Sequence, residues 1–88
     1  MNSEERRILE ENGFTKSPLH HCSYIKESGN KRTRVIYSLN TEKFKSFRRI
    51  KYTTAFGESS TGEERTYNTF NELLKTELQW LQKSYNVS

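Results

Sequence analysis

The feature that most constrains the fold is an amphipathic stripe near the end of the chain. Large apolar side chains recur there at steps of three and four residues, at Phe70, Leu74, Leu78, Leu81 and Tyr85. This spacing predicts one apolar face of an α-helix, which Leu73 and Trp80 widen. Thr69 and Glu72 have the spacing of a capping box, so we expect the helix to begin after Thr69. Such a helix needs an apolar surface to pack on, and the rest of the chain has to supply it.

Three stretches in the middle of the chain have the composition of β-strands, over residues 19–27, 31–39 and 43–56. The break Ser28-Gly29-Asn30 predicts a hairpin between the first two. Apolar and polar residues alternate along the second and third of these stretches. This alternation predicts an apolar sheet face made of Val35, Tyr37, Leu39, Ile50, Tyr52 and Phe56. We expect the helical stripe to pack on that face, although Phe47 and Arg48 break the alternation.

The remaining segments predict a first helix and a polar loop. Ser3 can cap a helix over residues 3–12, and Gly13 can end it in the left-handed conformation. Residues 57–65 (GESSTGEER) are polar and acidic and predict a loop, after which Tyr67 can extend a short edge strand. We therefore expect one α+β domain over residues 1–88. It has two layers in the order α-β-β-β-α, with a three-stranded, mainly antiparallel sheet.

Composition excludes several classes of protein. Only 31% of the residues are hydrophobic, which predicts a thin core. No stretch approaches the roughly 18 apolar residues of a membrane span, and the polar start does not resemble a signal peptide. The single cysteine, Cys22, cannot form an intrachain disulfide. We expect a cytoplasmic protein that does not contact membranes.

The formal net charge of +4 conceals a strong segregation. Residues 26–51 hold nine basic residues and two glutamates, a net charge of +7, whereas six basic and nine acidic residues elsewhere give −3. On the predicted strands most of these cations share one face. The candidate binding residues are Arg32, Arg34, Lys43, Lys45, Arg49 and Lys51, with Phe47 as a stacking ring.

A basic face that contains an aromatic ring suits an anionic partner, most simply nucleic acid, because cations meet phosphates and rings stack on bases. Two other interpretations of this basic face remain open. The face can be a solvated surface whose Lys and Arg protect sheet edges against aggregation. It can also contact an acidic protein surface, or the last helix can form a homodimer through Trp80.

Enzymatic and metal-binding motifs are weak in this sequence. His20, His21 and Cys22 are adjacent, but a structural zinc site needs four ligands and the chain has no other His or Cys. We expect Cys22 to be a small core residue. The glutamates have no spacing that brings two of them together in a cleft, and no glycine-rich phosphate loop is present. We expect no catalytic residue, no metal and no cofactor.

The predicted helix–three strands–helix order resembles the double-stranded-RNA-binding domain. In that family a lysine cluster at the start of the last helix grips phosphates. The corresponding positions here are Thr69, Phe70, Asn71 and Glu72, with Lys75 as the cation of that turn. The size and the composition, rich in glutamate and lysine, also resemble small proteins of phages and mobile elements that inhibit or regulate a host protein.

Overall fold

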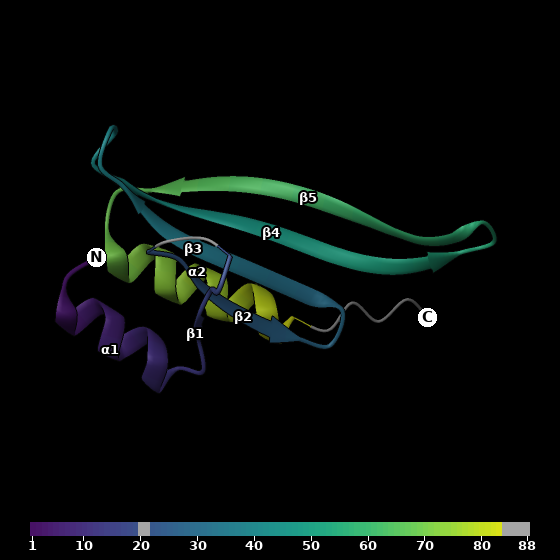
Figure 1. Ribbon diagram of the computed structural model, residues 1–88, viewed down its shortest axis with the longest axis horizontal. Coiled ribbons are helices and arrows are strands. Elements are labelled where there is room, and N and C mark those ends of the chain that lie inside the picture. The colour runs from purple at the N-terminus through teal and green to yellow at the C-terminus, as the bar shows by residue number, and fades with distance from the viewer. Residues whose placement is uncertain (20–21, 84–88) are drawn as a thin grey trace.

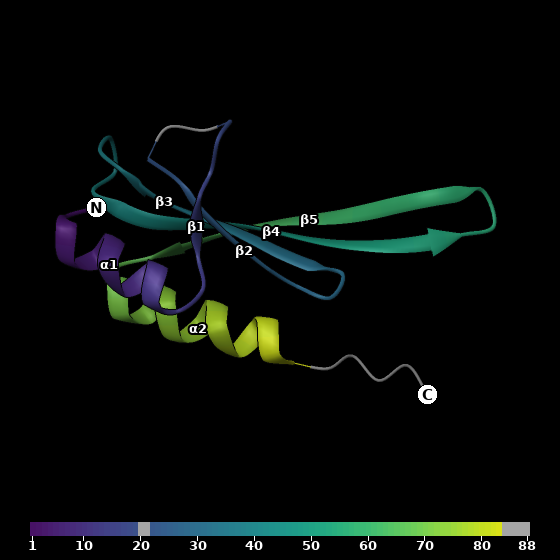
Figure 2. The same cartoon turned by 60° about the horizontal axis from the view of Figure 1, so that its bottom comes forward.

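A computed structural model describes residues 1–19 and 22–83, which form one antiparallel sheet with two helices on one face (Figures 1 and 2). The elements are α1 (Ser3–Glu11), β1 (Thr15–Lys16), β2 (Tyr24–Ser28), β3 (Lys31–Ser38), β4 (Lys43–Thr54), β5 (Gly57–Tyr67) and α2 (Phe70–Gln82). Each strand pairs with the next one along the chain, so the order across the sheet is β1-β2-β3-β4-β5. No helix in these described ranges is long and apolar enough to cross a membrane.

The α+β class and the β2–β3 hairpin are confirmed, but the sheet has five strands rather than three. The predicted loop over residues 57–65 is wrong, because these residues belong to β5. This strand pairs with β4 from Phe44 opposite Tyr67 to Thr54 opposite Gly57. The short β1 adds the fifth strand beside β2. The helix–three strands–helix order that underlay the resemblance to the double-stranded-RNA-binding domain is therefore not present.

Both ends of α1 are held by local hydrogen bonds. Its N-cap is Asn2 rather than the predicted Ser3, because Asn2 and Glu5 form a reciprocal capping box. At the other end, Gly13 has a φ of +89°. The Phe14 N–H donates to the Leu9 carbonyl, which closes a Schellman motif and brings Phe14 into the core beside Leu9.

The core lies between the helices and one half of the sheet. Its buried members are Leu9, Phe14, Tyr24, Val35, Phe44, Tyr67, Phe70 and Leu73. Of the predicted apolar face, Val35 is buried, but Leu39 is 82% exposed, Phe56 is fully exposed and Tyr52 is 43% exposed. Leu39 lies in the turn after β3, whereas Tyr52 and Phe56 belong to the β4–β5 hairpin, which extends past the end of α2 as a two-stranded arm (Figure 1). The far half of the predicted face therefore has no helix to cover it.

The helix α2 begins as predicted, since the Glu72 N–H donates to the Thr69 hydroxyl at 3.2 Å. Its buried positions are Phe70, Leu73, Glu77, Trp80 and Leu81, with Leu74 and Leu78 partly buried. Tyr85 lies outside the described residues. Trp80 is buried, so it is a core residue and is not exposed for contact with a second copy. One member of the buried stripe, Glu77, is charged.

Candidate nucleic-acid interface

The predicted binding residues lie together on the sheet face that the helices leave open (Figure 2). Alternation along β3 places Arg32 and Arg34 there, and the pairing of Arg32 with Arg49 and of Arg34 with Phe47 extends the face to β4. The same parity includes the remaining predicted residues of β4, which are Lys43, Lys45 and Lys51. All seven candidates thus share one face.

The other three basic residues of the 26–51 segment face the helices, and each has a structural partner. The Lys26 ammonium donates to the Asn12 carbonyl at the end of α1. The Lys31 ammonium donates to the Trp80 carbonyl at 2.8 Å, at the end of α2. Both lysines therefore satisfy carbonyls at the negative end of a helix dipole. Arg48 is buried, and its partners are described below.

The cations on the open face are only partly neutralised. Arg32 lies 3.6 Å from Glu27, and Lys45 lies 3.3 Å from Glu64. Lys43, Arg49 and Lys51 form no ion pair with any carboxylate in the described part of the chain. Arg32 and Arg49 are direct neighbours across β3 and β4. Like charges at directly opposed positions destabilise a sheet.

Arg34 and Phe47 form a stacked pair on this face. The guanidinium carbon of Arg34 lies 4.5 Å from the centroid of the Phe47 ring, which is within the range of a cation–π contact. Partial burial of the guanidinium, followed by the charge of nearby Arg32, lowers the pKa of Arg34. An anion at this position would relieve the repulsion between the two guanidinium groups.

The open face is hollowed around this pair. The hollow has a volume of about 560 Å³, and its walls are formed by Leu19, Arg32, Arg34, Phe47, Arg48, Arg49, Gly62, Glu63 and Glu64. Gly62 is opposite Arg49 on β5, so no side chain fills the face at that position. A Cβ added at Gly62 would meet nothing nearer than a backbone oxygen at 3.9 Å. The hollow therefore has room, in a size range typical of sites for small ligands.

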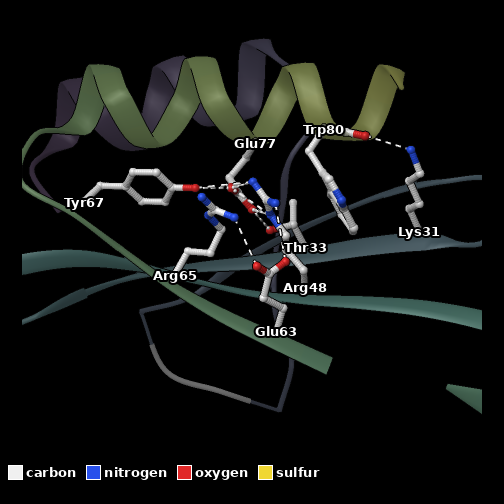
Figure 3. A network of polar contacts seen from close by, with 8 residues as sticks. All are labelled: Lys31, Thr33, Arg48, Glu63, Arg65, Tyr67, Glu77 and Trp80. Atoms are coloured by element: carbon white, nitrogen blue, oxygen red, sulfur yellow. Dashed lines mark hydrogen bonds and ion pairs between the residues drawn. The ribbon is translucent and has the colours of Figure 1, made fainter. Parts of the chain in front are cut away.

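A buried polar network lies on the opposite face of the sheet, under α2 (Figure 3). The carboxylate of Glu77 is fully buried and lies 2.6 Å from a terminal nitrogen of Arg48. It also accepts hydrogen bonds from the Tyr67 hydroxyl at 2.6 Å and from the Thr33 hydroxyl at 2.7 Å. Arg48 also stacks on the ring of Trp80, 4.8 Å from its centroid. This network ties α2 to β3, β4 and β5.

The network changes the acidity of its members. Burial by itself would raise the pKa of Glu77, but hydrogen bonds from Arg48, Tyr67 and Thr33 outweigh it. Together with the charge of Arg48, these bonds lower the pKa of Glu77 below its ordinary value of 4.5. Burial, and then the hydrogen bond to Glu77, raises the pKa of Tyr67 above 10.0. The ionised carboxylate and the neutral phenol are therefore the favoured forms at neutral pH.

The lowered pKa predicts a loss of stability in acid. Glu77 binds a proton less readily in the folded protein than in the unfolded chain. Its contribution to the free energy of unfolding is therefore complete above its ordinary pKa of 4.5. The contribution disappears as the pH falls through the lowered value. Urea unfolding between pH 7 and pH 3 should show a decrease in the free energy of unfolding that is smaller in a Glu77→Gln variant. An equal decrease in both proteins would contradict this assignment.

Cys22 is not a core residue. Cys22 is exposed and has a φ of +59°, so its prediction as a small core residue is wrong. It lies in the connection before β2, where the chain turns and is not packed under a helix. His20 and His21 are outside the described residues. Within residues 1–19 and 22–83, no three His, Cys, Asp or Glu side chains gather closely enough to hold a metal ion.

The open face thus combines paired cations, a stacked arginine and a hollow, which suits the binding of a polyanion. No protein-family model, curated protein or solved structure matches this chain. Its function is therefore inferred from the geometry of this face.

Proposed function

We propose that the protein is a non-enzymatic binding module whose open sheet face contacts the phosphates of a nucleic acid. The observation that carries the proposal is the direct cross-strand pairing of Arg32 with Arg49. Two guanidinium groups at opposed positions repel each other and cost stability, whereas a phosphate between them removes the repulsion. The repulsion between Arg32 and Arg49 lies on the open face, outside the core.

Protection of sheet edges is a poorer explanation of these charges. Lysine and arginine serve that purpose on edge strands, where backbone groups are unpaired. Here β3 and β4 are interior strands of the sheet, and together they hold all six predicted cations. Of these six, Lys51 lies just past the last residue of β4 that pairs with β3. The charges are therefore on the strands that need no protection.

The charge balance of the open face also supports an anionic partner. Register places three glutamates on this face, namely Glu27, Glu58 and Glu64. They oppose six lysines and arginines, and Glu58 lies near the tip of the β4–β5 arm, opposite Thr53. The hollow itself is lined by Arg32, Arg34 and Arg49 and by Glu64, whose carboxylate pairs with Lys45. The cations therefore exceed the carboxylates there, which attracts a polyanion and accelerates its association.

The test is a titration of labelled single- and double-stranded DNA and RNA at about 50 and 200 mM salt. Displacement of counterions by several phosphate contacts predicts that the affinity falls by orders of magnitude between these concentrations. The slope of log affinity against log salt then gives the number of contacts. If nothing binds at 50 mM salt, the proposal is wrong.

A protein-interaction module, such as a phage-type inhibitor or regulator, is the second candidate. The observation in its favour is the β4–β5 arm, which exposes Phe56 completely and Tyr52 by 43%. Aromatic side chains of this kind are common anchors at protein interfaces. Binding to an acidic protein surface, without binding to nucleic acid at low salt, would favour this candidate.

A further inference from the structure

We infer that the hollow binds one unpaired base of a single-stranded nucleic acid, stacked on the guanidinium group of Arg34. This inference rests on the proposed function and specifies the class of nucleic acid. It joins three observations: the stacked pair of Arg34 and Phe47, the space over Gly62, and the paired cations Arg32 and Arg49 at the rim.

The stacked pair provides a preorganised platform. Phe47 lies under Arg34 with 4.5 Å between its ring centroid and the guanidinium carbon, so one side of the guanidinium is already in contact. A guanidinium group is planar and weakly hydrated, and its other side can take a second π-system. Bases of single-stranded nucleic acids stack on arginine planes and on aromatic rings in this way. Little side-chain freedom remains to be lost on binding.

The space beside the platform fits a planar ligand. Gly62 lacks a side chain opposite Arg49, and the hollow of about 560 Å³ continues to Leu19. Leu19 is 82% exposed at the rim of the hollow and offers an apolar contact. A surface that contacts only phosphates has no need of an apolar wall or of a stacked arginine. These features therefore indicate a base rather than a second phosphate.

A duplex cannot use this platform without unpairing. Its bases are covered on both faces by their neighbours, so an Arg34 plane can reach a base only when that base is unstacked. Arg32 and Arg49 line the same hollow as Arg34 and can neutralise the phosphates on either side of the bound nucleotide. The site is therefore expected to prefer single strands.

The first experiment compares three probes of equal length by fluorescence anisotropy at about 50 mM salt. They are a single-stranded oligothymidine, a strand with the same phosphates and sugars but without the bases (an abasic strand), and a duplex. We expect the oligothymidine to bind at least about fivefold more tightly than the abasic strand, since stacking of one base gives roughly a 5- to 150-fold gain. The duplex is expected to bind like the abasic strand, through phosphates alone.

The second experiment removes the platform without removing charge. Phe47→Leu keeps an apolar side chain, and Arg34→Lys keeps the positive charge but loses the plane. Each is expected to lower the affinity for oligothymidine to that for the abasic strand, with little change in the salt dependence. Tyr52→Leu is the matched control, because Tyr52 is an aromatic residue of the same strand on the opposite face. Circular dichroism establishes that each variant is folded.

The outcomes separate the two proposals. Equal affinities of the wild-type protein for the oligothymidine, abasic and duplex probes would overturn the base site while leaving phosphate binding intact. An unchanged preference for bases in both Phe47→Leu and Arg34→Lys would also overturn it. If no probe binds at low salt, both the base site and the proposed function are wrong.

Discussion

Replacing Glu77 with leucine is expected to lower the free energy of unfolding by about 3–5 kcal/mol. The change leaves the guanidinium of Arg48 buried beside Trp80, with Glu63, 3.6 Å away and half exposed, as its remaining acidic partner. It also removes the acceptor for the buried hydroxyls of Tyr67 and Thr33. A domain of this size has a total stability of roughly 4–13 kcal/mol, so the loss is a large fraction of it. Urea unfolding at pH 7, followed by circular dichroism, measures the effect.

Two further variants show whether the loss arises from the unpaired charge. In the double variant Glu77→Leu with Arg48→Leu no buried charge remains, so the part of the loss that comes from the unpaired guanidinium is expected to return. The hydroxyls of Tyr67 and Thr33 still lack their acceptor, so stability stays below that of the wild-type protein. Glu72→Ala is the control on the same helix, because Glu72 is exposed and its loss should cost less than about 1 kcal/mol. If Glu77→Leu alone is as stable as the wild-type protein, the network does not hold α2 on the sheet.

The helices and the first hairpin could be predicted because each has a local cause. The stripe of α2, the Asn12-Gly13 break after α1 and the Ser28-Gly29-Asn30 turn are all visible within a few residues of sequence. The strand β5 has no comparable signal. All of its residues except Ser59 and Tyr67 are exposed, so alternation of apolar and polar residues has no reason to appear. The strand is held mainly by its backbone pairing with β4.

The open face could be predicted from parity alone, because a strand sends alternate side chains to opposite faces whatever covers them. The buried network was missed, yet a signal was present. Glu77 lies four residues after Leu73 and three before Trp80, inside the apolar stripe. Arg48 likewise interrupts the apolar parity of β4. Two opposite charges at positions that are both expected to be buried are best explained as partners, since an unpaired buried charge is prohibitively costly.

The core and the open face make opposite use of arginine, and this allows binding to be tested apart from folding. Arg48 is neutralised inside the protein and stabilises the attachment of α2. Arg32 and Arg49 repel each other on the surface, so their replacement removes an unfavourable contact. Neutral substitutions of these arginines are therefore expected to change affinity with little loss of stability. A charge reversal at Arg32 places a carboxylate opposite Glu27, so circular dichroism has to establish that such a variant is folded.

The double charge reversal Arg32→Glu with Arg49→Glu is expected to weaken nucleic-acid binding by roughly 100-fold or more at 50 mM salt. Both rim cations are lost, and the new carboxylates repel the phosphates that the arginines attract. The salt slope should fall by about one for each lost contact. Anisotropy titrations against a labelled single strand measure both quantities.

The control for this variant carries the same change in net charge at a different place. Arg6→Glu with Lys75→Glu also reduces the formal net charge from +4 to zero, because each reversal removes two units. Arg6 and Lys75 are exposed on α1 and α2, on the other side of the sheet. We expect this variant to retain most of its affinity, since long-range attraction is largely screened beyond roughly 14 Å at 50 mM salt. Equal losses in the two variants would mean that total charge, and not the open face, governs binding.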